Sequence, residues 1–86
     1  MPYYVYILLC EDGSYYTGYT RDAESRFEQH KRGLGARYTM MRRPLRIVYM
    51  EEVESRGEAV KRELEIKSLS HEEKGELVGS SDGEEM

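Results

Sequence analysis

The hydrophobic positions of this chain change from a strand-like to a helix-like pattern as the sequence proceeds. Residues 3–10 (YYVYILLC) are aromatic, β-branched or aliphatic almost throughout, and residues 15–20 (YYTGYT) are similar in character. Such compositions favour β-strands. Residues 46–51 (RIVYME) contain a third run of this kind. The sequence therefore predicts three strands, with the first two adjacent along the chain.

The EDGS segment between the first two strands predicts a hairpin, whose form decides which side chains share a face. A two-residue Asp-Gly loop would pair Glu11 with Ser14, which places Tyr6 and Tyr16 on opposite faces. A three-residue loop with a left-handed glycine and a bulge would pair Cys10 with Ser14, which places Tyr6 and Tyr16 on the same face. The residues allow both forms. We expect the second, because only this form lets the two tyrosines share one site.

Helix-capping residues predict three helices between and after these strands. Asp22 can cap a helix that ends near residue 32, where Gly33 provides a stop. Two S-x-x-E capping boxes open a helix over about 55–69 and a short helix over about 70–78. The longer of these two helices is expected to pack four apolar residues inward: Ala59, Val60, Leu64 and Ile66.

The remaining segments lack a regular period. Residues 33–44 show neither the helical nor the strand pattern and are expected to form a basic loop. Residues 79–86 are polar and acidic, and we expect them to be a disordered tail. A chain of 86 residues has room for one hydrophobic core, so we predict a single domain over residues 1–78.

Composition sets several classes of protein aside. The single cysteine, Cys10, cannot form an internal disulfide, and its spacing from His30 and His71 does not match a zinc site. No stretch approaches the roughly 18 consecutive apolar residues of a membrane span, and the beginning lacks the features of a signal peptide. We therefore expect a cytoplasmic protein without membrane association.

The charges are unevenly distributed along the chain. The formal net charge is −4, yet residues 21–46 contain eight basic and three acidic residues. Residues 50–86, in contrast, contain five basic and twelve acidic residues. A phosphate-binding surface requires only a local positive field. The basic segment is therefore compatible with a nucleic-acid surface, and equally with an ordinary solvated loop.

Hydrolysis of a phosphodiester requires an activated water, neutralisation of charge on the phosphate oxygens, and help for the leaving oxygen. Glu63 can supply an oxygen ligand to a hard divalent ion, although it also has the spacing of an ordinary helical ion pair with Lys67. Arg26 can hold a phosphate or pair with an acidic residue on its own helix. Tyr6 can relay a proton, and Gly18 can let a phosphate approach the sheet. Taken singly, each residue is better explained by a structural role.

The joint order of these residues resembles that of the GIY-YIG nuclease domain. The segment Tyr4-Val5-Tyr6 is similar to the first family motif, and Tyr16-Thr17-Gly18 is similar to the second. Arg26 falls where the phosphate-binding arginine of the family is expected, and His30 matches a histidine seen in several members. Glu63 lies in the segment RELEIK, which resembles the metal-binding helix.

The chain is most similar to the short, stand-alone subgroup of this family, over about residues 3–78. Three further segments recur in that subgroup: Ala36-Arg37-Tyr38-Thr39, Arg43-Pro44-Leu45 and Ser68-Leu69-Ser70. The chain departs from the family pattern at Tyr4, where glycine is usual, and at Thr17, where an apolar residue is usual. It also contains no asparagine, whereas many nuclease members carry one beyond the metal-binding glutamate.

The resemblance implies an α+β fold in which helices flank a three-stranded antiparallel sheet, in the order ββαβαα. It also implies a single Mg²⁺ or Mn²⁺ ion held by Glu63, with Arg26 as the charge stabiliser. Tyr6 would be the base or relay, and Tyr16 would position the water or phosphate. The residues implied to contact phosphate or nucleic acid are Gly18, His30, Arg37, Arg42, Arg43 and Lys67.

The function expected from this resemblance is hydrolysis of DNA phosphodiester bonds by a small metal-dependent endonuclease. We expect single-stranded or structured DNA as substrate, in repair or recombination, and DNA is favoured over RNA by the resemblance alone. Two alternatives stay open. One is a non-catalytic nucleic-acid-binding module of the same fold, and the other is a protein-interaction domain whose tyrosine-rich face meets a partner. A monomer is compatible with each of them.

Overall fold

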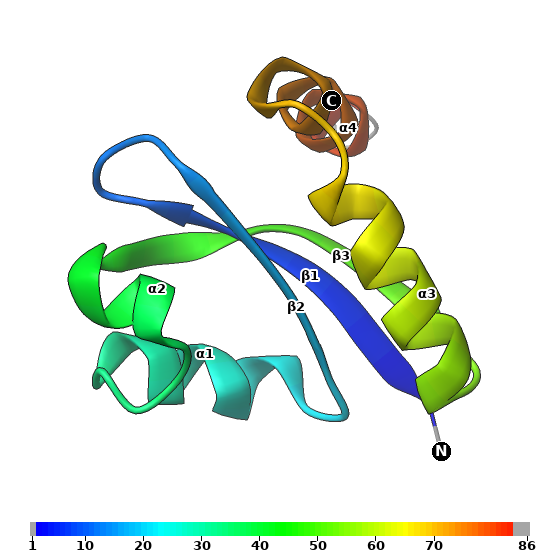
Figure 1. The fold of residues 1–86 in the computed structure, drawn as a ribbon, viewed down its shortest axis with the longest axis horizontal. Helices are drawn as coiled ribbons and strands as arrows, with labels where there is room; N and C mark the ends of the chain where they lie inside the picture. The colour runs from blue at the N-terminus through cyan, green and yellow to red at the C-terminus, as the bar shows by residue number, and fades with distance from the viewer. Residues whose placement is uncertain (1, 84–86) are drawn as a thin grey trace.

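The computed structural model, which describes residues 2–83, contains a three-stranded antiparallel sheet flanked by helices (Figure 1). Strand β1 (Tyr3–Cys10) lies in the centre of the sheet, between β2 (Tyr15–Thr20) and β3 (Pro44–Val53). Strands β1 and β2 have the predicted bounds. Strand β3 is longer than the predicted 46–51, because its pairing with β1 continues at both ends of that run. The expected α+β class and sheet are confirmed.

The hairpin between β1 and β2 has the three-residue form. The Cys10 N–H donates to the Ser14 carbonyl at 2.9 Å, and the Gly13 N–H donates to the Cys10 carbonyl at 2.9 Å. Gly13 has a φ of +83°, the left-handed conformation that this loop needs and that glycine adopts without strain. The resulting register pairs Leu8 with Tyr16, so Tyr6 and Tyr16 lie on the same face as predicted.

Three helices begin at the predicted caps: α1 (Ala23–Lys31), α3 (Arg56–Lys67) and α4 (His71–Gly83). The Asp22 carboxylate accepts from the Ser25 backbone N–H at 3.1 Å, and the Ser55 hydroxyl accepts from the Glu58 N–H at 3.2 Å. These side chains satisfy backbone donors that have no partner within the helix. Within residues 2–83, none of the helices combines the length and apolar character that crossing a membrane requires.

Two segments differ from the prediction. A short helix, α2 (Arg37–Met41), occupies part of the expected loop, because the buried Thr39 hydroxyl bonds to the Ala36 carbonyl and holds the turn closed. Residues 79–83 belong to α4 rather than to a disordered tail, since no proline or long β-branched run stops the helix before Gly83. The rest of the expected tail, residues 84–86, lies outside the described part of the chain.

The apolar core lies on the side of the sheet covered by α3 and α4 (Figure 1). Its fully or nearly buried members are Val5, Ile7, Ala59, Ile66 and Val78. Leu64, which was expected to pack inward, is instead 60% exposed, because it lies off the face of α3 that carries Ala59 and Ile66. The opposite side of the sheet, covered by α1 and α2, carries the alternate residues of β1.

Candidate active site

Tyr6 and Tyr16 meet beneath α1 on this second face. Their ring centroids lie 6.5 Å apart, and the ring of His30 lies 6.0 Å from Tyr6 and 5.1 Å from Tyr16. Gly18 faces Tyr6 across the ladder, and a Cβ atom there would come within 2.6 Å of the Tyr6 hydroxyl oxygen. Gly18 therefore makes room for the Tyr6 phenol. The expectation that it lets a phosphate approach was wrong, because the tyrosine fills that space.

His30 joins the tyrosine pair to α2 through hydrogen bonds at both ring nitrogens. Its Nε2 lies 2.9 Å from the Tyr6 hydroxyl, and its Nδ1 lies 2.7 Å from Thr39 Oγ1. The Thr39 hydroxyl also lies 2.9 Å from the Ala36 carbonyl. Because His30 is fully buried, it cannot contact a phosphate directly, contrary to expectation. A Cβ atom on Gly35 would collide with the imidazole, so this glycine lets the loop close over the ring.

These short contacts favour one tautomer of His30. If Thr39 donates to the Ala36 carbonyl, its oxygen accepts from His30 Nδ1–H, and Nε2 can accept from the Tyr6 hydroxyl. This arrangement supplies a hydrogen to each of the three contacts. In the other tautomer, Nδ1 accepts the hydrogen of the Thr39 hydroxyl, so no hydrogen remains between Thr39 Oγ1 and the Ala36 carbonyl oxygen. That tautomer gains only a long contact of 3.4 Å from the Ala36 N–H to Nδ1. In the favoured tautomer Tyr6 is the donor and His30 is the acceptor.

Arg26 and Glu63 place opposite charges close to both phenols. Burial, followed by the neighbouring Tyr16, raises the pKa of Tyr6 to about 12, against the lowering effect of the Arg26 guanidinium. Burial and then the Glu63 carboxylate raise the pKa of Tyr16, which Arg26 again lowers. Burial and then Arg26 lower the pKa of His30 to about 4, so its ring is neutral at physiological pH. The Arg26 guanidinium and the Glu63 carboxylate therefore both influence the protonation of the two phenols.

Glu63 lies on the side of α3 that faces the sheet, and its carboxylate raises the pKa of Tyr16 from there. It lies four residues after Ala59 and three before Ile66, both of which are fully buried, so the three side chains share one side of the helix. The Glu63 side chain is only 15% exposed, and its Oε1 lies 3.6 Å from Lys67 Nζ. Lys67 therefore forms an ion pair with the predicted metal ligand, and its contact with phosphate stays a prediction.

Two further side chains, Tyr38 and Arg42, pack next to Tyr16. The Tyr38 ring lies 5.7 Å from the Tyr16 ring, and the Arg42 guanidinium lies 4.4 Å above Tyr38. Arg42 also forms an ion pair with Asp12 at 3.1 Å, and this pair ties α2 to the hairpin. Arg37 and Arg43, the other two predicted nucleic-acid contacts on this part of the chain, are exposed.

Sequence reasoning missed three residues of this network: Gly35, Tyr38 and Thr39. All three lie in or next to the segment Ala36-Arg37-Tyr38-Thr39, which recurs in the stand-alone subgroup but has no regular period that predicts a helix. The recurrence was the signal that could have identified them. The recurrence could not reveal their contact with His30, because that contact depends on the path of the chain between α1 and α2.

Glu63 is the one predicted metal ligand of the site, so a divalent cation there would have few protein ligands. Within residues 2–83, no group of three or more His, Cys, Asp or Glu side chains is arranged to hold a metal. A shielded carboxylate such as Glu63 still suits Mg²⁺ or Mn²⁺, because these ions prefer oxygen and retain several waters while sharing the oxygens of a substrate phosphate.

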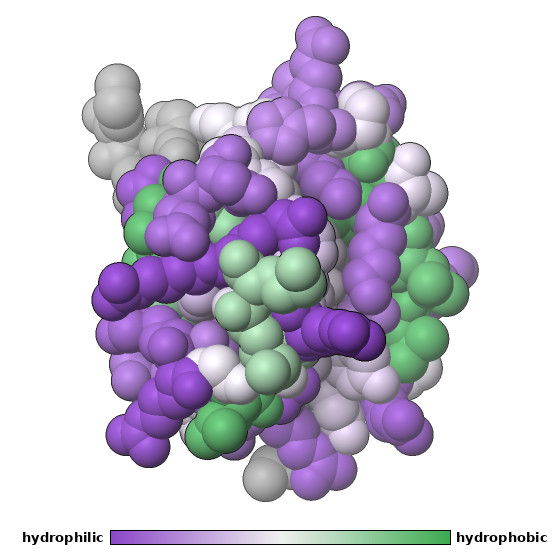
Figure 2. Space-filling model, turned by 60° about the vertical axis from the view of Figure 1, so that its left-hand side comes forward, coloured by the Kyte–Doolittle hydropathy of each residue, from purple (hydrophilic) through white to green (hydrophobic). Residues whose placement is uncertain are grey.

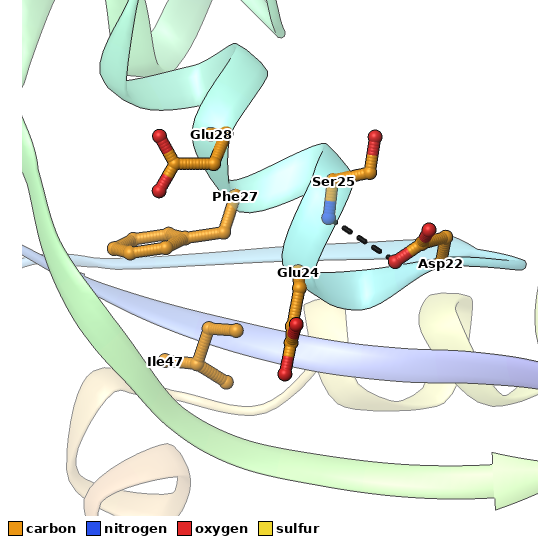
Figure 3. Close-up of a pocket in the computed structure, with 6 residues that line it drawn as sticks. All are labelled: Asp22, Glu24, Ser25, Phe27, Glu28 and Ile47. Carbon is orange, nitrogen blue, oxygen red and sulfur yellow. Dashed lines mark hydrogen bonds between the residues drawn. The ribbon is translucent and has the colours of Figure 1, made fainter.

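A hollow of the structure lies elsewhere, beside α1. This pocket, between α1 and β3, has a volume of about 470 Å³. In Figure 3, Phe27 and Ile47 point into it. Three carboxylates also line it, from Asp22, Glu24 and Glu28. These residues lie on a different side of α1 from Arg26 and His30. The pocket would repel a phosphate, so we do not assign the site to it.

Known proteins similar to this chain indicate its family. The family model described as the GIY-YIG catalytic domain matches residues 2–76. The chain belongs to this nuclease family. A UPF0213 protein of Staphylococcus aureus is 50% identical over 76 residues, which cover 88% of this chain and 93% of the relative. The name of that relative states no function.

Two solved structures are also similar. The solution structure of the UPF0213 protein BH0048 from Bacillus halodurans has 48% identity and a TM-score of 0.59, covering 92% of this chain and 84% of that one. The solution structure of protein EF2693 from E. faecalis has 36% identity and a TM-score of 0.63, covering 95% and 88%. Both are consistent with the sheet and helices described above.

Proposed function

We propose that this protein is a metal-dependent endonuclease that hydrolyses DNA phosphodiester bonds at the cluster of Tyr6, Tyr16, Arg26 and Glu63. One observation carries the proposal. The hairpin register brings two phenols together, and a guanidinium and a carboxylate from different helices both influence the pKa of these phenols. Three distant parts of the chain thereby supply the three kinds of group that phosphodiester hydrolysis uses.

The chemistry follows from the protonation states. A phenol whose pKa is about 12 carries its proton at neutral pH, so Tyr6 can accept a proton from water only while it passes its own to another group. His30 Nε2, 2.9 Å away, is that acceptor. Burial and Arg26 oppose a charged imidazole, but the negative charge of an entering phosphate favours it.

Arg26 and Glu63 have complementary roles in this proposal. The guanidinium of Arg26 offsets negative charge on the non-bridging phosphate oxygens as it grows in the transition state. Glu63 would hold Mg²⁺ or Mn²⁺, which when bound supplies further charge neutralisation for the phosphate and the leaving oxygen. Tyr16 orients the water or the phosphate beside Tyr6.

A nuclease assay tests the proposal. Single-stranded, duplex and branched DNA, together with single-stranded RNA, would be incubated with Mg²⁺, Mn²⁺ or chelator. We expect metal-dependent cleavage of DNA that Glu63→Gln and Arg26→Met each reduce about 10³-fold, because each removes charge stabilisation from the transition state. Glu65→Gln is the matched control, since it removes an exposed carboxylate from the same helix. Cleavage that survives both site variants would refute the assignment. Preference for branched or single-stranded DNA would support a role in repair or recombination.

A second candidate function is a binding module that does not cut. The Tyr6 side chain is only 2% exposed, and burial keeps its phenol protonated; both properties suit a structural tyrosine. Such a module would bind DNA in a salt-sensitive way and give no product at any metal concentration. The same assay, combined with binding measurements over a range of salt concentrations, separates the two candidates.

A further inference from the structure

Exposed apolar side chains gather around α2. The large hydrophobic residues in this part of the chain are Leu34, Met40, Met41 and Leu45, with 69%, 62%, 72% and 54% of their surface exposed. We call these four residues the methionine patch. Figure 2, in which the α2 end of the molecule comes forward, shows hydrophobic surface lying between strongly hydrophilic side chains. Exposed apolar residues that cluster in this way mark an interaction surface.

The patch is fixed relative to the candidate active site. Within α2, Thr39 points inward to His30 and is 2% exposed, while the next two residues, Met40 and Met41, point outward. Tyr38, on the same helix, packs against Tyr16. The methionines are thus within one helical turn of residues that contact the tyrosine pair, and the whole helix is anchored through the buried histidine.

The charge around the patch indicates an anionic partner. Residues 31–46, which contain all four patch residues, include six basic and no acidic residues. Two of the six already have acidic partners, since Lys31 pairs with Glu28 and Arg42 with Asp12, both at exposed positions where such pairs are weak. A partner that fits must present negative charge and flat apolar surface side by side. Nucleic acid does so, with phosphates next to bases.

We propose that the methionine patch contacts the bases of DNA bound next to the candidate active site, while the neighbouring arginines hold the phosphates. Methionine and leucine side chains can insert against or between bases and unstack them, and the thioether adapts its shape to the surface it meets. The inference rests on the proposed nucleic-acid substrate, but it does not depend on cleavage.

Binding and fluorescence measurements with chelator present test the inference, because nothing is cut under these conditions. The probe is single-stranded and duplex DNA containing 2-aminopurine, whose fluorescence rises when its base unstacks. We expect the double variant Met40→Gln/Met41→Gln to bind about tenfold more weakly, through lost apolar burial, and to lose the rise in fluorescence. Its dependence on salt should equal that of the wild type, because no charge has changed.

Two further variants make the result specific. Arg37→Gln/Arg43→Gln should also weaken binding, but should lower the slope of log K against log salt by about two, one for each lost phosphate contact. Leu64→Gln is the matched control, since Leu64 is comparably exposed on α3, outside the patch, and should change nothing. The substituted side chains are exposed, and thermal unfolding would confirm that each variant folds.

The possible outcomes are distinct. DNA binding and fluorescence unaffected by the methionine substitutions would overturn the inference. A methionine variant that keeps DNA binding but loses self-association, or loses binding to an acidic peptide, would show a protein-binding surface instead. If the wild type binds no DNA, both the inference and the proposed function fall. If it binds through the patch and never cuts, the inference stands without the nuclease.

Discussion

The two faces of β1 are equally buried but differ in chemistry. Val5 and Ile7 point toward α3 and α4 and belong to the apolar core, whereas Tyr6 points toward α1 and meets His30. An apolar core stabilises the fold without directional contacts. A buried polar group costs free energy unless every donor finds an acceptor, so the tyrosine face is ordered by its hydrogen bonds. One side of β1 thereby contributes to the apolar core, and the other side buries Tyr6 and His30, whose pKa values are shifted by that burial.

The largest loss of stability should come from a substitution on the apolar face of β1 and α3. Ile66→Ala removes a fully buried side chain and should lower the free energy of unfolding by about 3 kcal/mol, through lost burial and a residual cavity. Urea unfolding followed by circular dichroism measures the change. At temperatures where the variant stays folded, DNA binding should be unaltered. Altered binding by fully folded protein would show that the two faces are coupled.

Gly18→Ala should affect the tyrosine face with somewhat smaller cost. The added Cβ would come within 2.6 Å of the Tyr6 hydroxyl oxygen, so the phenol must move from His30. We expect about 2 kcal/mol of destabilisation from this overpacking, and a larger loss of cleavage than stability alone explains. Gly79→Ala serves as the control, because a Cβ there meets nothing within 4 Å. Normal cleavage by Gly18→Ala would contradict the role given to Tyr6.

The protonation of His30 should make folding sensitive to acid. Its pKa is lowered from 6.5 to about 4 in the folded protein, so the folded state binds fewer protons between these values than the unfolded state does. The free energy of unfolding should therefore fall, by roughly 2 kcal/mol, as the pH drops from about 6.5 to 4. Urea unfolding at several pH values measures this, and His30→Gln should flatten the curve in that window. An unchanged slope in this variant would refute the buried neutral histidine.

The smallest effect on stability is expected at Thr39, where a substitution can remove a hydrogen bond without changing the shape of the side chain. Thr39→Val keeps the shape of the side chain but removes the hydroxyl, whereas Thr39→Ser retains it. We expect Thr39→Val to destabilise the protein by about 1 kcal/mol and to release the His30 tautomer, with about tenfold slower cleavage. Nitrogen chemical shifts of the imidazole report the tautomer directly. A wild-type histidine that carries its proton on Nε2 would contradict the proposed direction of transfer.

Local features of the sequence were sufficient to predict most of the secondary structure. The apolar runs predicted β1 and β2 with the observed bounds, and Asp22 and Ser55 predicted the starts of α1 and α3. Such signals act within a few residues, so they can be read along the chain. Helix α2 was missed because its stability comes from Thr39 and the ring of His30, nine residues away, rather than from any propensity of its own.

The primary structure alone determined the family, the strand and helix order, and which residue types could take part in phosphodiester chemistry, since each depends on motifs and spacing. Only the folded chain decided how those residues meet. It selected the hairpin register that pairs Tyr6 with Gly18, gave the space above Gly18 to the Tyr6 phenol, and buried His30 away from any phosphate. The reason is physical: burial and hydrogen bonding depend on distances between groups far apart in the chain, and those distances exist only once helices and sheet have packed.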